Sequence, residues 1–153
     1  MKKWILKIVL PLTVISFGAF TKWWYALPVD APDTMFTGFP LAYSCPGWHT
    51  SLSLQIFVIE LIIDILFYFL IWFILIFCID RFLTKIKTFT LLTIGLWTVS
   101  GLFIAFGALL VTNKDNIFYI KRPFDMQVLE TGYEFIWQHT ERPDYYKYFP
   151  KDK

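Results

Sequence analysis

Three long runs of apolar residues dominate the first three quarters of the chain, and short polar segments separate them. The runs lie at about 4–22, 52–80 and 89–111. A helix needs about 20 mostly apolar residues to cross the hydrocarbon core of a bilayer. The pattern therefore predicts an all-α integral membrane protein, with three transmembrane helices in a membrane region at 1–112 and a polar tail at 113–153.

The first run is the shortest of the three and allows two interpretations. A basic start followed by an apolar stretch is also typical of a secretory signal peptide. The residues that follow, FGAFTKWWYA, make a poor cleavage site for such a peptide. We therefore interpret the run as a retained helix, kinked at Pro11 because proline lacks a backbone N–H. Cleavage as a signal stays the alternative.

The polar segments predict how the spans are oriented. The inner loop, 80–88, contains Arg81, Lys85 and Lys87, and further lysines precede the first run. Short loops rich in Lys and Arg stay in the cytoplasm. Both counts place the N-terminus in the cytoplasm of a multi-pass protein of the cell inner membrane. The outer loop, 23–51, and the C-terminal tail are then extracytoplasmic.

The two extracytoplasmic segments differ in their expected order. Prolines and glycines interrupt the outer loop, whose aromatic and aliphatic residues favour a compact, ordered loop. The tail is mixed and partly irregular: IFYI and YEFIWQ are candidate short strands, whereas DMQVLETGYEFIWQHT is a candidate weak helix. A segment of about 40 residues rarely buries a core of its own. We therefore expect the tail to pack on the outer loop or on another chain.

The composition agrees with a membrane location and excludes one class of partner. Hydrophobic residues make up 57% of the chain and charged residues 17%, against roughly 25% charged in soluble domains. Half of the 14 Lys and Arg residues and seven of the 12 Asp and Glu residues lie after Thr112. The net charge is only +2, and no basic patch interleaves with aromatic residues. We therefore expect no nucleic-acid partner.

Two acidic residues within the second run are the main candidates for function. Glu60 and Asp64 are four residues apart, so on a helix they share one face. On the same helical period His49 and Ser53 extend this polar stripe outward, and Tyr68 lies at its edge. A charged side chain in lipid costs at least ~2.5–3.5 kcal/mol and usually faces protein or water. The stripe is therefore a functional hypothesis.

Three interpretations of the stripe follow. In the first, Glu60 and Asp64 dock against a partner that supplies Arg or Lys. In the second, they belong to a proton- or cation-translocating assembly. In the third, Cys45 and His49 form an outward-facing enzyme site. A metal site needs three or four ligands, which this spacing does not supply. We therefore assign no catalytic residue, metal or cofactor.

The third run carries small residues that suit close helix packing. Gly101, Ala105 and Ala108 let another backbone approach, either within the chain or from a partner. Besides the lipid bilayer, the expected partner is another integral membrane protein or a second copy of the chain. The predicted function is that of a non-catalytic accessory or structural subunit of a larger membrane complex, docking through the Glu60/Asp64 face.

Overall fold

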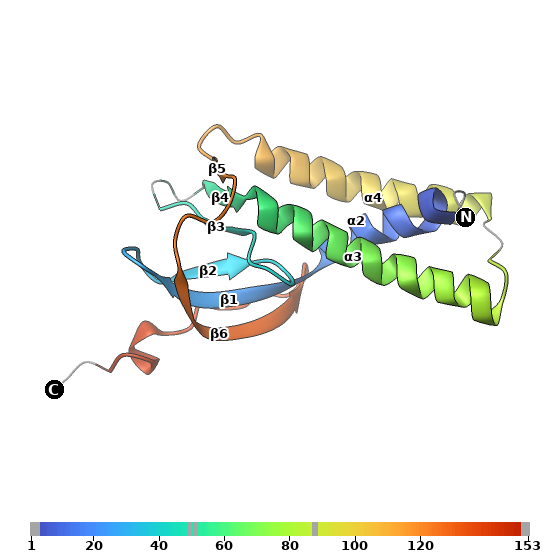
Figure 1. Cartoon of the computed structure of the whole chain (residues 1–153). Coiled ribbons are helices and arrows are strands. Elements are labelled where there is room, and N and C mark those ends of the chain that lie inside the picture. Colours follow the sequence, from blue (N-terminus) through green and yellow to red (C-terminus); the bar gives the residue numbers. More distant parts are fainter. Residues whose placement is uncertain (1–3, 49, 51, 87–88, 151–153) are drawn as a thin grey trace. The chain divides into compact units, whose positions relative to one another are not determined.

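The computed structural model describes residues 4–48, 50, 52–86 and 89–150, and the chain divides into two compact units (Figure 1). The helical unit comprises the chain segments 1–19 and 64–113. The sheet unit comprises 20–63 and 114–153. Each unit is therefore assembled from two segments that are far apart in the sequence.

The described part of the helical unit contains three helices, two of which are extended by π-helical turns. They are η1 (Ile5–Val9) with α2 (Leu10–Ala19), the part of α3 (Val58–Cys78) from Asp64 onward with η2 (Ile79–Leu83), and α4 (Thr90–Val111). In η1 the Leu10 N–H donates to the Ile5 carbonyl. Pro11 has no N–H, so the Lys7 carbonyl lacks its usual helical donor. The wide turn therefore coincides with the proline that the sequence singles out.

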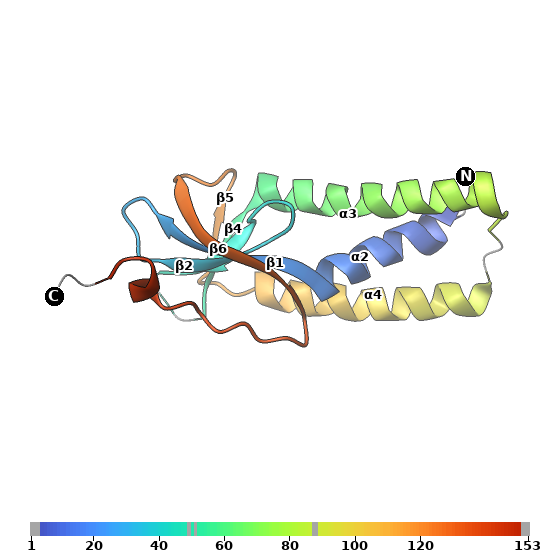
Figure 2. The ribbon, with the colours of Figure 1, turned by 90° about the horizontal axis from the view of Figure 1, so that it is seen from below.

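Helix α2 packs between the other two helices (Figure 2). The Trp72 indole N–H on α3 donates to the Ser16 hydroxyl at 2.8 Å, and the Ser100 hydroxyl on α4 donates to the Pro11 carbonyl at 3.0 Å. These bonds satisfy polar groups inside the bundle. The apolar cluster beside them contains the buried residues Trp4, Ile8, Val9 and Ile76.

Among the described residues, two helices are long and apolar enough to cross a membrane. They are Val58–Leu83, with a mean hydropathy of 2.8, and Thr90–Val111, with 2.1. The helical segment Ile5–Ala19 is shorter. At 1.5 Å per residue it spans only about 22 Å of the ~30 Å hydrocarbon core. The prediction of three spanning helices is therefore wrong for the described residues, because residues 20–22 of the expected first span belong to a strand.

In the sheet unit, the residues that the structure describes form six strands in the order β5-β4-β3-β2-β1-β6. Strands β4 and β5 pair in parallel, and all other neighbours are antiparallel. A short 3₁₀ turn, η3 (Tyr145–Lys147), lies in the segment after β6. The strands are β1 (Phe20–Pro28), β2 (Thr34–Thr37), β3 (Ser44–Pro46), β4 (Leu54–Phe57), β5 (Ile117–Tyr119) and β6 (Met126–Phe135).

One face of this sheet forms an aromatic core. Phe36 on β2 and Phe57 on β4 are fully buried, and the rings of Phe57 and Phe124 meet edge to face at 5.8 Å. Edge-to-face pairs add roughly 0.5–1.5 kcal/mol beyond burial. Phe124 belongs to the loop between β5 and β6. The core therefore ties this loop to the sheet, close to the start of α3.

The prediction of an all-α fold is wrong, because a mixed sheet is built from segments expected to be loop and tail. The outer loop contributes β2, β3 and most of β1, and the tail contributes β5 and β6. The second helix begins at Val58 rather than at residue 52, because LQIF forms β4. The strands β2 to β5 have only three or four residues and leave little periodicity, and the pairings of β1 with β6 and of β4 with β5 join segments that are distant in sequence.

Candidate functional site

Glu60 lies in the first turn of α3, three residues after β4 ends. A carboxylate is favourable there because the helix N-terminus carries partial positive charge. The Ile59 N–H donates to the Ile120 carbonyl at 3.0 Å, which continues the pairing of β4 with β5. This pairing brings the segment Lys121–Asp125 next to Glu60. In the sequence, most of α3 and all of α4 lie between Glu60 and this segment.

The two oxygens of the Glu60 carboxylate have different surroundings. Oε1 accepts a hydrogen bond from the Arg122 backbone N–H at 3.3 Å. Oε2 is buried and accepts no hydrogen bond from the described part of the chain, in a residue that is only 7% exposed. A buried acceptor without a donor costs roughly 1–3 kcal/mol, and more when charged. Such groups are rare, so this oxygen requires a physical explanation.

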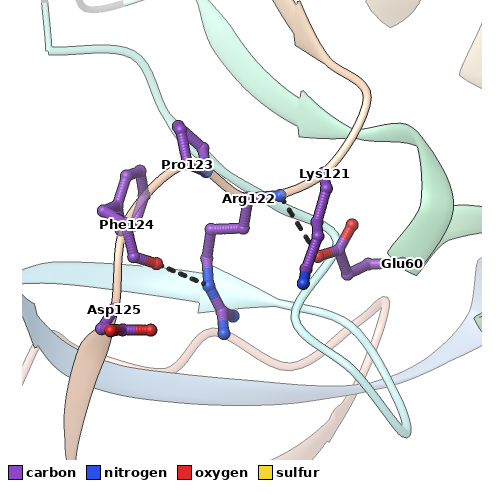
Figure 3. A pocket seen from close by; sticks show the side chains of 6 residues that line it. All are labelled: Glu60, Lys121, Arg122, Pro123, Phe124 and Asp125. Carbon is purple, nitrogen blue, oxygen red and sulfur yellow. Dashed lines mark hydrogen bonds between the residues drawn. The ribbon is translucent and has the colours of Figure 1, made fainter.

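A pocket of about 270 Å³ lies beside this carboxylate. Its lining is Glu60 together with the segment Lys121–Asp125 (Figure 3). At ~30 Å³ per water molecule, the space corresponds to about nine waters. The carboxylate with the unsatisfied oxygen is therefore part of the wall of a space that can hold a small polar group.

The charges around the pocket balance formally. Glu60 and Asp125 are acidic, and Lys121 and Arg122 are basic. The Arg122 guanidinium is held by its own loop: Nε donates to the Phe124 carbonyl at 3.2 Å (Figure 3), and Nη1 contacts the Met126 sulfur at 3.7 Å. No side-chain nitrogen of Lys or Arg among the described residues lies within 4.0 Å of the Glu60 carboxylate. The pocket thus presents separated charges of both signs.

The outer part of the expected polar stripe does not lie on the helix. Ser53 precedes β4, is buried, and donates from its hydroxyl to the Thr50 carbonyl at 3.0 Å. The helical period that joined Ser53 to Glu60 therefore does not apply, since α3 begins at Val58. His49 lies outside the described residues.

The inner part of the stripe belongs to the helical unit. Asp64 is fully buried, and Tyr68 is buried with its ring edge-on to Phe17 at 5.9 Å. The small residues Gly101 and Ala105 on α4 are exposed, as is Ala108. Apart from Gly101, its two chain neighbours and the nearby backbone of α4, no atom of the described residues lies within 4 Å of a Cβ built at Gly101. Within the described chain, therefore, no other helix packs closely against Gly101.

Cys45 lines a second, larger pocket in the sheet unit. This pocket measures about 520 Å³, and Glu134, His139 and Arg142 also line it. Burial raises the pKa of the Cys45 thiol to about 12. A thiol must lose its proton to act as a nucleophile or to bind a metal. The described residues contain no group of three or more His, Cys, Asp or Glu side chains that could hold a metal ion.

The segment after β6 is fastened to the sheet by charged groups. Arg142 pairs with Asp33, which also accepts a hydrogen bond from the Tyr25 hydroxyl. Burial and the neighbouring Asp33 raise the pKa of Tyr25 to about 12. For Asp33 burial acts upward, but Arg142 and Tyr25 together lower its pKa below the ordinary value. A second ion pair joins Lys147, in a later part of the same segment, to Glu130 on β6.

Sequence reasoning identified Glu60 but missed the residues that complete its pocket. Lys121, Arg122 and Asp125 lie in the tail, in the short run KRPFD directly after IFYI. The signal that could have found them is the cluster of both charges next to a candidate strand. Their proximity to Glu60 depends on the parallel pairing of β4 with β5, which no local pattern reveals.

Comparisons with known proteins give no family for this chain. No family model, curated protein or solved structure matches it.

Proposed function

We propose that this chain is a non-catalytic accessory or structural subunit of a larger membrane complex, in which Glu60 accepts a cationic group of a neighbouring component. The observation that carries the proposal is the state of Glu60, whose buried Oε2 has no hydrogen-bond donor among the described residues and which is one of the residues that line a pocket. An N–H donor of a cationic group would satisfy that oxygen, and charge-assisted hydrogen bonds of this kind are short and strong.

The membrane location is supported by α3 with η2 and by α4. Both are long and apolar enough to cross, and most of their large apolar side chains are exposed. Such a surface is stable in lipid, whereas soluble proteins rarely expose apolar patches of this extent. The two helices would anchor the sheet unit to the membrane.

The pairing of strands supports one arrangement of this anchor. Strands β4 and β5 pair with each other, although α3 and α4 separate them in the sequence. If both helices cross, the chain returns to the side it left, and the whole sheet lies on one side. Arg81 lies in η2, at the end of the span Val58–Leu83, and Lys85 follows it; the positive-inside rule assigns this end of the two helices to the cytoplasm. The sheet unit is then extracytoplasmic.

A role without catalysis is supported by the chemistry of Cys45. Its thiol stays protonated at neutral pH, because burial raises its pKa to about 12. It therefore lacks the thiolate character of a catalytic cysteine. Glu60 instead has the features of a binding residue, because it is held in place by the Arg122 backbone and by the helix that carries it.

Photocrosslinking from the pocket tests the proposal. A photoreactive p-benzoyl-phenylalanine at Pro123, an exposed pocket residue, is activated in intact membranes, and the adduct is identified by mass spectrometry. We expect one defined adduct, which Glu60→Gln abolishes. Glu141→Gln is the matched control, since Glu141 is exposed and outside the pocket. An adduct that is equally abundant in both variants would contradict the role of Glu60.

A further inference from the structure

We infer that the Glu60 pocket binds the phosphoethanolamine headgroup of a membrane lipid. The inference rests on the proposed function, because it names the carrier of the cationic group that Glu60 accepts. The lipid's ammonium would donate to Glu60 Oε2, and its phosphate would lie against Lys121 and Arg122. Each step of the argument concerns a different property of the pocket.

The first property is the balance of charge. A ligand that is only cationic is attracted by Glu60 but repelled by Lys121 and Arg122, which line the same space. A ligand that is only anionic meets the opposite conflict with Glu60 and Asp125. A compact zwitterion places each of its charges next to the opposite charge of the pocket. Like-charge juxtaposition is costly, so a zwitterion is the ligand that this lining favours.

The second property is the set of available donors and acceptors. Arginine has five N–H donors, and in the described chain Arg122 uses Nε for a carbonyl and Nη1 for a weak contact to sulfur. Lys121 is exposed and contributes up to three more donors. Phosphate oxygens are the acceptors that such donors prefer. The pocket can therefore bind a phosphate at one end and an ammonium at the other.

The third property selects the kind of ammonium. Glu60 Oε2 is a buried acceptor, so its partner must carry an N–H. A primary ammonium has three, whereas the trimethylammonium of a choline headgroup has none. Quaternary ammonium groups are recognised by cages of aromatic rings. Among the pocket-lining residues only Phe124 is aromatic, which disfavours choline.

The fourth property is depth in the membrane. The span Val58–Leu83 contains 26 residues, or about 39 Å at 1.5 Å per residue. The hydrocarbon core takes only ~30 Å of this length, and the headgroup layers extend beyond it. Glu60, in the first turn of that span, is therefore expected at the level of the lipid headgroups.

Native mass spectrometry of the protein released from mixed bilayers tests the inference. Bilayers contain phosphatidylethanolamine and phosphatidylcholine with identical acyl chains, and the bound lipid is counted. We expect the wild type to retain the ethanolamine lipid about tenfold or more over the choline lipid, because only the former completes a charge-assisted hydrogen bond. Glu60→Gln should remove this preference, and Glu141→Gln should keep it. Equal retention of the two lipids would overturn the inference.

Two further arms make the result decisive. Lys121→Gln changes an exposed side chain and should weaken retention of the ethanolamine lipid even if Glu60→Gln fails to fold. Unchanged retention in this variant would overturn the assignment of the phosphate end. Free phosphoethanolamine should compete only weakly. Competition at the affinity of the lipid would identify a soluble ligand and overturn the membrane source.

The test separates this inference from the proposed function. A protein adduct that depends on Glu60, found together with no lipid preference, would overturn the lipid and support a basic side chain of a partner protein. If neither the adduct nor the lipid preference depends on Glu60, both proposals fail.

Discussion

Replacing Gly38 by alanine should unfold the sheet unit at a markedly lower temperature. Gly38 follows β2 with a φ of +148°, a conformation that L side chains rarely adopt. Its N–H donates to the Lys22 carbonyl at 2.9 Å, and its carbonyl accepts from the Trp24 indole at 2.8 Å. The residue therefore fastens the turn after β2 onto β1 from both sides.

The size of the effect follows from two contributions. A non-glycine residue at such a φ costs roughly 1–3 kcal/mol. The added Cβ would also lie against the Leu41 carbonyl oxygen and 2.7 Å from the Tyr43 nitrogen, so the backbone must move. Overpacking of this kind costs about 1–3 kcal/mol. Together they give about 2–6 kcal/mol, a large share of a typical stability of roughly 5–15 kcal/mol.

Thermal unfolding followed by tryptophan fluorescence in detergent measures this change. For a domain of 60–100 residues, 1 kcal/mol corresponds to about 4–8 °C, so a loss of about 8 °C or more is expected. Gly101→Ala is the control, because open space surrounds Gly101 on α4 and alanine favours a helix by about 1 kcal/mol. The reasoning is refuted if Gly38→Ala unfolds at the wild-type temperature.

Three further predictions concern pKa values. The stability that Asp33 contributes should be complete above the ordinary aspartate pKa of 3.8 and should be lost as the pH falls through its lowered pKa. Unfolding temperatures measured from about pH 5 to pH 2 should show this loss of stability, and Arg142→Gln should remove it. The contribution of Tyr25 should be complete below pH 10 and be lost as pH rises towards its pKa of about 12; tyrosinate absorbance compared with Tyr25→Phe measures this titration, and ionisation near pH 10 would contradict it. Cys45 should resist maleimide at about pH 8 in the folded protein and react after unfolding in detergent, as peptide mass mapping would show; rapid reaction in the folded state would contradict its burial.

The apolar helices were predictable because their signal is local and long. The run at 89–111 corresponds to α4 at Thr90–Val111, and the run at 52–80 contains most of Val58–Leu83. The error at the start of the second run has a simple cause. LQIF is as apolar as the helix that follows, so hydropathy alone does not separate β4 from α3.

The sheet was not predictable in the same way, because its strands obtain their stability from distant partners. Phe20–Pro28 pairs with Met126–Phe135, more than 90 residues later in the chain. Glycine disfavours the interior of a helix, so Gly132 argues against a helix in the tail. In the sheet Gly132 faces the Trp23 ring, where a Cβ would lie 2.6 Å from the nearest ring atom. The residue thus excluded the wrong element without identifying its partner strand.

The candidate site likewise contains a residue that a local pattern identifies and a residue whose position depends on distant strand pairing. Glu60 was identifiable because an acid in an apolar run is costly and therefore informative. Arg122 was not identifiable, because it lies 62 residues after Glu60 in the sequence. Its backbone N–H reaches Glu60 only through the pairing of β4 with β5. The predicted stripe through His49 and Ser53 required a helix that includes these residues. In the structure the helix begins at Val58, six residues after the expected start at residue 52.

The most direct test of the central claim is an experimental structure of the protein crystallised from a lipid mesophase that contains phosphatidylethanolamine. The account expects a nitrogen of a bound group, from outside the chain, at about 2.7–3.2 Å from Glu60 Oε2. The account is contradicted if a side chain of the chain itself, such as Lys121, donates to this oxygen and fills the pocket.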